Sequence, residues 1–274
     1  MHGCARMCWT PPPGTLAVPP DPDLDLLYVG VFARLLQGRR HPLIGTNSPA
    51  PATAALLARA LLRDAGGDMH VTILGSPRHS LLTDDLAELF DSAARGMFDA
   101  FFIGGGQIDG KANVNLVGVG SYPALEKRWP GSHGTPLLYL MIPNAVVYVR
   151  AEHSRRTLVP EVDFISTAGV SEPGVHRPGG PVAMVTSRCV FRFHRDRERF
   201  ELVSLHPGHT LDEVTRNTGF DFDVAARVEE TQGPDCAMLR LLRSRVLPEI
   251  APLYPQFAAR LARDVEARLQ PQPG

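Results

Sequence analysis

Lysine is nearly absent from this sequence, and so is any long apolar run. Lys111 and Lys127 are the only lysines in a chain of 274 residues with a net charge of -1. This balance of charge gives no reason to expect a nucleic acid or an anionic membrane as a partner. No segment stays apolar over the roughly 20 residues that a membrane-spanning helix needs. The start MHGCARMC lacks the basic and apolar regions of a signal peptide, so we expect a cytoplasmic protein.

Cysteine is also scarce, with four residues in the whole chain. Cys4 and Cys8 lie near His2, but structural zinc sites usually need four ligands with tight Cys-x-x-Cys spacing, and no second pair follows. Cys189 and Cys236 are isolated in apolar contexts. We therefore expect reduced thiols and no metal site.

Proline is concentrated near the N-terminus, which sets the expected domain organisation. Residues 1–23 end in the segment WTPPPGTLAVPPDPD and are expected to form a disordered lead-in. No linker, repeat or shift in composition divides residues 24–250, which predicts a single domain there. Residues 251–274 are expected to form a helical tail, either packed or mobile.

Helical and strand patterns alternate in the first half of the chain. Helical spacing of apolar residues predicts helices over 24–38, 52–66, 84–96, 210–219 and 235–250, the third capped by Thr83 or Asp84. Apolar runs that end in turn residues predict strands over 41–45, 69–75, 98–106, 135–143, 145–153, 162–169, 181–193 and 199–208. This order indicates an α/β fold with a mostly parallel sheet flanked by helices and an added mixed or antiparallel layer.

Three glycine turns follow the first three predicted strands and begin at Gly45, Gly75 and Gly104. Ligands of open parallel sheets bind at the carboxyl ends of the strands, so these turns are expected to converge. Glycine lets the backbone approach a ligand closely, and exposed N–H groups can hold an oxyanion or a phosphate. The turns match neither the dinucleotide nor the P-loop glycine pattern. We therefore expect a pocket for an anionic or carbonyl-containing small molecule.

Several longer segments resemble one known family. IGTNSPAPATAALLARAL, FIGGGQIDGKANVN, EHSRRTLVPEVDFISTAG and SLHPGHTLDEVTRNTGF occur in the order found in β subunits of class I CoA-transferases. The similarity runs from about Leu26 to about Asp223 and extends to the related steroid-ring-cleaving hydrolase subunits. The resemblance implies a Rossmann-like subunit that pairs with a homologous α subunit. It also implies an acyl-CoA thioester at their interface, with coenzyme A as part of the substrate and no metal.

The resemblance also implies which residues meet the substrate. In the family, the glycine turn lies against the thioester, and backbone N–H groups stabilise the oxyanion formed on attack, each by roughly 3–4 kcal/mol. The expected contacts are Gly104, Gly105, Gly106 and Asn113, with Asn47 and Gln107 as catalytic donors. The alternatives are that Asn47 caps the following helix and that Gln107 braces the turn.

One departure from the family bears on the mechanism. True class I CoA-transferases carry a nucleophilic glutamate in a Ser-Glu-x-Gly turn, but the corresponding turn here reads GSPRHSLLTDD. The first glutamate after it is Glu88, inside the next helix, and Asp84 and Asp85 stand where carboxylates cap helices. The steroid-ring hydrolases also lack this glutamate and use an acid of the α subunit.

The same turn supplies other candidates. His79 is a candidate general base, and Arg78 could hold a carboxylate or a phosphate. The alternative is a solvent-facing polar turn. Ser76 has no base assigned beside it and is a weaker candidate nucleophile. His206, at a strand end, is expected to be a hydrogen-bonded structural residue.

Three hypotheses follow. The first is a hydrolase or lyase subunit acting on an acyl-CoA. The second is a CoA-transferase whose nucleophile comes from the partner or from an atypical acid. The third is a scaffold subunit without catalytic residues, against which the three consecutive glycines argue.

Overall fold

The computed structural model describes residues 22–80, 82, 83, 85–150 and 152–270. Most of the expected lead-in, with Cys4, Cys8 and Asp84, lies outside these residues. The central feature is an eight-stranded sheet. Its strands are β1 (Pro42–Ile44), β2 (Thr72–Ile73), β3 (Ala100–Ile103), β8 (Ala145–Tyr148), β9 (Pro181–Val185), β10 (Cys189–His194), β11 (Arg199–Leu205) and β12 (Asp223–Glu230).

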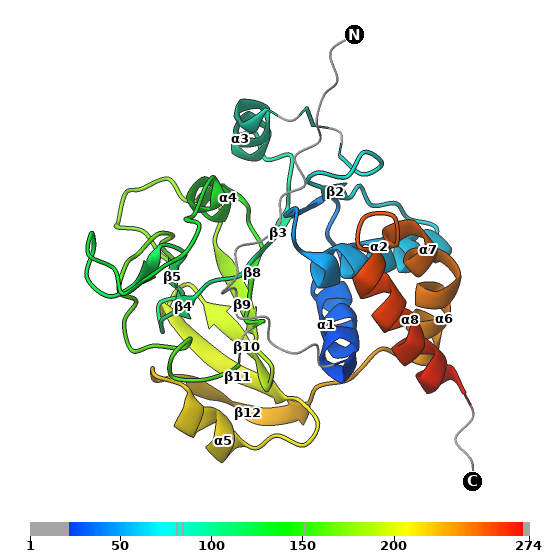
Figure 1. Ribbon diagram of the computed structural model, residues 1–274. Helices are drawn as coiled ribbons and strands as arrows, with labels where there is room; N and C mark the ends of the chain where they lie inside the picture. The colour runs from blue at the N-terminus through cyan, green and yellow to red at the C-terminus, as the bar shows by residue number, and fades with distance from the viewer. Residues whose placement is uncertain (1–21, 81, 84, 151, 271–274) are drawn as a thin grey trace.

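The strands lie in the order β12-β11-β10-β9-β8-β3-β1-β2 (Figure 1). From β2 to β9 every neighbouring pair is parallel, whereas β10 is antiparallel to both of its neighbours. The expected mostly parallel sheet is thus confirmed, and its antiparallel strands extend the same sheet. Both edges are short or irregular, because β2 has two residues and the pairing of β12 shifts register between Leu202 and Ser204.

Helices cover both faces of the sheet. The bounds are α1 (Pro22–Leu35), α2 (Pro49–Asp64), α3 (Leu86–Ala94), α4 (Thr135–Met141), α5 (Leu211–Asn217), α6 (Cys236–Leu241), α7 (Leu247–Ile250) and α8 (Pro255–Leu269). Figure 1 shows α1, α2 and α6–α8 grouped on one side, with α3 and α4 on the other. No helix of the described chain combines the length and apolar character needed to cross a bilayer.

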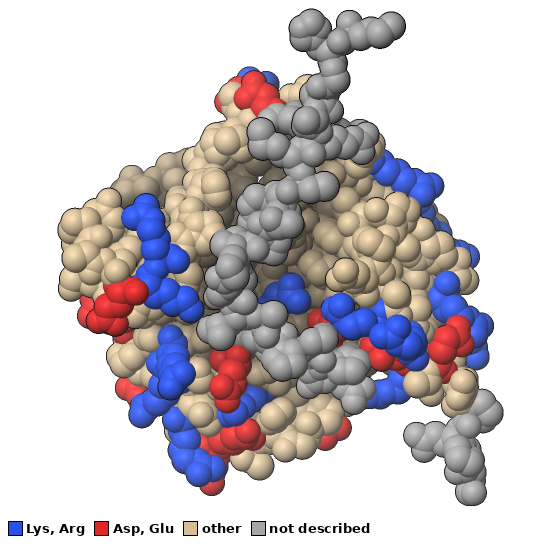
Figure 2. Space-filling view, viewed as in Figure 1, with Lys and Arg blue, Asp and Glu red and all other residues tan. Residues whose placement is uncertain are grey.

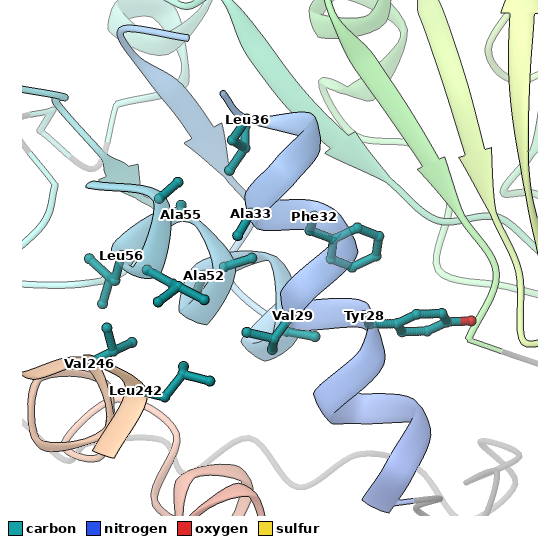
Figure 3. Close-up of a cluster of buried hydrophobic side chains, with 14 of the residues drawn as sticks. Tyr28, Val29, Phe32, Ala33, Leu36, Ala52, Ala55, Leu56, Leu242 and Val246 are labelled. Carbon is teal, nitrogen blue, oxygen red and sulfur yellow. The ribbon is translucent and has the colours of Figure 1, made fainter. Parts of the chain in front are cut away.

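The alternation of side chains along β3 explains the two layers. Successive residues of a strand point to opposite faces. Ala100 and Phe102 join the hydrophobic cluster under α1 and α2, whereas Phe101 and Ile103 join the cluster under α3 and α4. Figure 3 shows the first cluster, in which Phe32 packs with its ring centroid 5.0 Å from that of Phe102. A strand buried on both faces is therefore a continuous apolar run, as in AFFI.

The C-terminal helices belong to the same packed layer. Leu242 and Val246, in a π-helical turn between α6 and α7, pack against α2 (Figure 3). The predicted helix over 235–250 is thus interrupted by this turn. Residues 255–269 form α8, and its buried Phe257 and Leu261 lie in the cluster with α1. This segment is thus helical and packs against the rest of the layer.

Three local predictions are wrong. Residues 135–141 form α4 and not a strand, because Pro136 occupies the first helical turn, where its missing N–H costs nothing. Residues 162–169 form no ladder, and only Thr167 makes an isolated bridge there. The cap of α3 is not Thr83 but Asp85, whose carboxylate accepts the Ala87 N–H and so has the capping role expected of an acid at this helix start.

Two small hairpins follow β3. One pairs β4 (Gln107–Ile108) with β5 (Val114–Asn115), and the other pairs β6 (Gly118–Val119) with β7 (Lys127–Arg128). The second is called the 118–128 hairpin below. Both extend the GGGQID turn away from the sheet on the side of α4 (Figure 1).

Candidate functional site

The carboxyl edge of β1, β2 and β3 brings the glycine turns together. The turns after β1 and β2 touch, since a β-carbon at Gly75 would lie 3.1 Å from the Thr46 methyl group. Gly75 has φ +76°, a left-handed conformation in which side chains are strained. Gly104, at the end of β3, lies beside the carbonyl of Tyr148, where β8 ends. These turns thus form one polar edge.

Asn47 is exposed at this edge. The N-cap of α2 is Ser48, which makes no side-chain capping bond, so the alternative role of Asn47 as the cap is wrong. Ser48 Oγ lies 3.4 Å from Tyr148 Oη, and Tyr254 Oη donates to the Thr46 carbonyl. Burial raises the pKa of Tyr148 and of Tyr254, so both hydroxyls stay protonated. They fix this turn and leave the Asn47 amide at the surface.

The glycines after β3 have an internal reason to be there. A β-carbon at Gly105 would overlap Val114, and one at Gly106 would overlap the ring of Trp129. The Gly106 N–H is already used, because it donates to the Asn115 carbonyl at 3.0 Å. Close packing within the chain therefore accounts for two of the three glycines. Their presence no longer argues against a scaffold role.

Gln107 braces the turn with its side chain. Its Nε2 donates to Asp163 Oδ2 at 3.1 Å, and its Oε1 accepts from Asn115 Nδ2 at 2.7 Å and from the Asp163 N–H at 3.0 Å. Asn113 acts similarly, donating to Asp109 Oδ2 and accepting the Gly169 N–H, each at 3.0 Å. The geometry favours the bracing alternative for Gln107, and it engages Asn113 within the protein.

Replacing Gln107 by Met is expected to destabilise the protein by roughly 2 kcal/mol, because it leaves the buried Asn115 amide and the Asp163 N–H without these hydrogen bonds. Urea unfolding at neutral pH measures the change. The matched control is Gln232→Met, at an exposed position where the side chain makes only a local bond to Glu230. Equal unfolding midpoints for the two variants would contradict the bracing role.

His79 directs its side chain toward α2 and α7, while its backbone lies beside the last residue of β2. Its carbonyl accepts the Ile73 N–H at 3.0 Å, so the chain has already turned back along β2. Its Nε2 lies 3.4 Å from Glu249 Oε1, which accepts from Arg59 Nη2 at 2.7 Å. Arg59 is ten residues into α2, about 15 Å from the start of that helix at 1.5 Å per residue. Burial lowers the pKa of His79, and the geometry favours a structural role for this ring.

The rest of this turn divides between surface and interior. Arg78 is exposed near Gly75. Ser76 is buried, and its Oγ accepts the His79 N–H at 3.2 Å. This hydroxyl thus bonds a backbone group and not a base, which leaves Ser76 a poor nucleophile.

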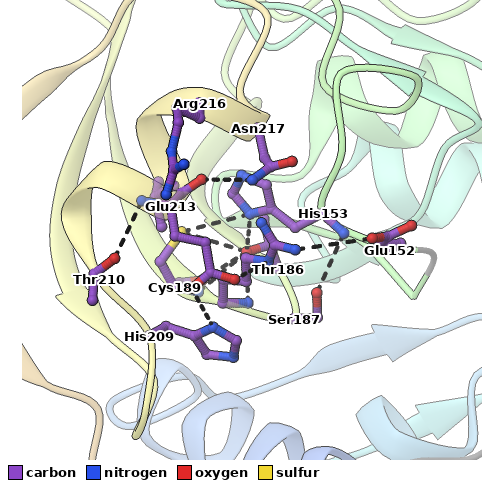
Figure 4. A network of polar contacts seen from close by, with 12 residues as sticks. Glu152, His153, Thr186, Ser187, Cys189, His209, Thr210, Glu213, Arg216 and Asn217 are labelled. Atoms are coloured by element: carbon purple, nitrogen blue, oxygen red, sulfur yellow. Dashed lines mark hydrogen bonds and ion pairs between the residues drawn. The ribbon is translucent and has the colours of Figure 1, made fainter.

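Two further histidines are buried among threonines. His153 contacts Thr186 Oγ1 through Nδ1 at 2.8 Å and Thr218 Oγ1 through Nε2 at 3.0 Å (Figure 4). His206 faces the Thr186 carbonyl through Nε2 at 2.8 Å and Thr231 Oγ1 through Nδ1 at 2.9 Å. A carbonyl only accepts, so Nε2 of His206 carries the proton. Burial lowers the pKa of both rings to about 4, and the prediction that His206 is structural is confirmed.

Other parts of the site carried little signal in the sequence. Trp129 and Asp163 meet the glycine turn from distant loops, and no local pattern marks them. Tyr148 ends β8, but the predicted strand over 145–153 continues past it, so the sequence did not place this side chain at the edge. The described residues contain no group of three or more His, Cys, Asp or Glu side chains placed to hold a metal ion.

A cavity lies beside the GGGQID segment but does not include its three glycines. Basic and acidic side chains are interspersed over the lower half of the face in Figure 2. The cavity has a volume of about 570 Å³ and lies between the turn around Lys111 and the hairpin around Glu198. Its lining includes Asp109 and Asn113 but none of the three glycines after β3.

Known proteins share both the sequence and the fold. The β subunit of 3-oxoadipate CoA-transferase from Pseudomonas knackmussii is 34% identical over 155 residues, covering 54% of this chain and 59% of that protein. The β subunit of glutaconate CoA-transferase from Acidaminococcus fermentans is 32% identical, covering 54% and 56%. The cholesterol ring-cleaving hydrolase IpdB subunit from Rhodococcus jostii is 29% identical, covering 59% and 64%. The matched stretch thus spans less than two thirds of each relative.

Crystal structures extend the likeness of the fold. Glutaconate coenzyme A-transferase from Acidaminococcus fermentans superposes with a TM-score of 0.70 at 22% identity, covering 83% of this chain and 96% of that chain. Rhodococcus jostii IpdAB superposes with a TM-score of 0.68 at 24% identity, covering 81% and 93%.

The coenzyme A transferase family model matches residues 65–217, more than half of the chain. This stretch contains the turns after β2 and β3, the two hairpins and the His153 and His206 network. The resemblance first seen in GGGQIDGKANVN is confirmed, and the chain belongs to the coenzyme A transferase family.

Proposed function

We propose that this chain is the β-type subunit of a heteromeric enzyme that cleaves an acyl-CoA, by hydrolysis of a carbon–carbon or thioester bond. Its partner is a homologous α-type subunit. The exposed Asn47 amide stabilises the oxyanion, and Arg78 binds an acidic group of the substrate. The partner subunit supplies the acid that is essential for the reaction.

The observation that carries this proposal is the turn after β2. Residues 75–80 contain no carboxylate that could form an acyl anhydride and then a glutamyl-CoA thioester. Glu249 contacts this turn through His79, but its carboxylate is held by Arg59 at 2.7 Å. That ion pair lies between α2 and α7. Among the described residues, neither this turn nor Glu249 supplies a free carboxylate for a covalent route.

Hydrolysis fits the remaining groups. Water adds to a carbonyl of the acyl-CoA, and the carbonyl oxygen gains the negative charge that N–H donors stabilise. Collapse of this adduct releases either coenzyme A or a carbon fragment as its enolate, which then gains a proton. The similarity to a subunit of a cholesterol ring-cleaving hydrolase supports this choice.

A CoA-transferase is the second candidate. The relatives at 34% and 32% identity are named as subunits of such enzymes. In this case the nucleophilic carboxylate comes from the partner or from an atypical acid. The product is an acyl-CoA made from a second carboxylic acid.

Labelling with oxygen-18 water distinguishes hydrolysis from CoA transfer. The full chain is co-purified with its α-type partner and incubated with a panel of acyl-CoAs, and the masses of products and subunits are recorded. We expect label in a released acid and no CoA adduct on either chain. In the same assay, Asn47→Ala is expected to slow turnover about 100-fold, the loss typical of one oxyanion donor.

Two other results would contradict these expectations. A CoA adduct that borohydride traps, together with unlabelled acyl exchange, would establish the transferase and overturn the hydrolytic proposal. Turnover that is unaffected by Asn47→Ala would remove this residue from the site.

A further inference from the structure

The 118–128 hairpin lies against the glycine turn through one aromatic side chain. The ring of Trp129, the residue after β7, occupies the space where Gly106 would carry a β-carbon. The backbone N–H of Trp129 donates to the Val117 carbonyl at 2.9 Å, which fixes the main chain of this residue at the base of the hairpin. Trp129 is only partly buried.

One carboxylate joins the hairpin to the turn. Asp163 Oδ2 accepts the Gly120 N–H at 2.8 Å and Gln107 Nε2 at 3.1 Å. Gly120 belongs to the outer part of the hairpin, and Gln107 directly follows the three glycines. Because bonds to a charged acceptor are stronger than neutral ones, Asp163 is the main tie between the two segments.

Asn115 makes further hydrogen bonds at the base of the 118–128 hairpin. Asn115 Nδ2 donates to the Gly118 carbonyl at 2.7 Å, and Asn115 Oδ1 accepts the Val117 N–H at 2.9 Å. The hairpin also presents apolar surface, since Tyr122 is 60% exposed with its ring 5.5 Å from that of Phe164. The neighbouring Ile165 is 52% exposed. Tyr122 and Ile165 thus expose apolar surface on the hairpin and on the adjacent loop.

We propose that Trp129 forms one wall of the acyl site and that Asp163 holds the 118–128 hairpin over the glycine turn. This inference rests on the proposed function, because it takes the ligand to be an acyl-CoA. An indole presents a flat apolar surface, which suits an apolar acyl group and not the phosphates of coenzyme A. Trp129 is thus a specificity-determining residue, and Asp163 is a positioning residue.

A single fluorine label at Trp129 tests whether this side chain contacts the acyl group. The chain has two tryptophans, so a Trp9→Phe variant made with 5-fluorotryptophan carries its only fluorine signal at Trp129. Spectra are recorded with coenzyme A, acetyl-CoA and octanoyl-CoA, on the full chain and on its complex with unlabelled partner. We expect octanoyl-CoA to shift the signal strongly and free coenzyme A to leave it nearly unchanged. Calorimetry on the same samples reports binding itself.

An Asp163→Asn substitution tests whether the Asp163 carboxylate holds the hairpin against the glycine turn. In Asp163→Asn the Trp129 signal of the ligand-free chain is expected to move and to show a larger solvent isotope shift, because the hairpin is less firmly held. The matched control is Glu161→Gln, an exposed carboxylate on the same loop, which is expected to leave the signal in place. Circular dichroism shows whether each variant is folded. A folded Asp163→Asn variant with the unchanged Trp129 signal would overturn the role of Asp163.

The possible outcomes distinguish a failure of this inference from a failure of the proposed function. If calorimetry detects octanoyl-CoA while the Trp129 signal stays fixed, the wall is elsewhere and the proposed function stands. If no thioester binds to the chain or to the complex, both are overturned.

Discussion

Lowering the pH from 7.5 to 5 is expected to reduce the free energy of unfolding by about 4 kcal/mol through His153 and His206 alone. Both side chains are buried, with 0% and 3% of their surface exposed. Burial lowers the pKa of each from 6.5 to about 4. Each ring therefore stays neutral in the folded protein at a pH where the unfolded chain has bound a proton.

The direction follows from the proton count. Between pH 6.5 and 4 the unfolded state binds more protons than the folded state, so stability falls as the pH falls. The contribution is complete above pH 6.5 and is lost progressively toward pH 4, by about 2 kcal/mol per ring at pH 5. Burial also lowers the pKa of His41 and His79, which adds to the loss with the same sign.

Urea unfolding at a series of pH values measures this dependence. The His153→Gln variant keeps an amide among the threonines but cannot titrate, so its stability is expected to fall less steeply below pH 6.5. The control is His133→Asn, at an exposed position. A slope for His153→Gln as steep as that of the control would contradict the assignment.

Gly169→Ala is expected to destabilise the protein by roughly 3 kcal/mol, at the upper end of overpacking costs. A β-carbon at Gly169 would lie 2.6 Å from the carbonyl carbon of Ala112 and 2.7 Å from its oxygen. Backbone atoms cannot turn away as a side chain does, and Ala112 is itself fixed at φ +59°. The loop around Gly169 and the turn around Ala112 must therefore separate.

The matched control is Gly233→Ala, where a β-carbon would meet nothing within 4 Å. Its expected effect is within about 0.5 kcal/mol, as for surface substitutions in general. Thermal unfolding of the two variants gives the comparison. Similar midpoints would mean that the chain near Gly169 yields more easily than this packing implies.

Local sequence patterns predict the fold where one pattern has one explanation. ATAALLARALLRD is helical both as expected and as observed, because its apolar residues recur at helical spacing. TPLLYLMIP is ambiguous, since a short apolar run fits a buried strand or a buried helix, and Pro136 is the residue that distinguishes them. The edge strand DVAARVEE is missed because six of its eight residues are charged or small, and only pairing with β11 makes it a strand.

The site shows the same limit. The positions of the three turns follow from the order of strand and helix, which the sequence contains. The contact between Gly106 and Trp129 spans a loop of more than twenty residues, and Gln107 and Asp163 lie still farther apart. Such contacts depend on how the loops fold back, so a glycine-rich turn alone does not distinguish a ligand from a packed side chain. The contact of His79 with Glu249 likewise depends on how the chain turns back after β2.

The irregular edge at β12 has a consequence for solubility. A free strand edge is a template on which other chains can add strands and aggregate. Here residues 223 and 224 pair with β11, the pairing slips, and it resumes only at residues 229 and 230. A straight foreign strand would find two short matching stretches separated by a bulge that carries Arg227, and the opposite edge at β2 offers two residues. The sheet is thus protected at both ends against growth into fibrils.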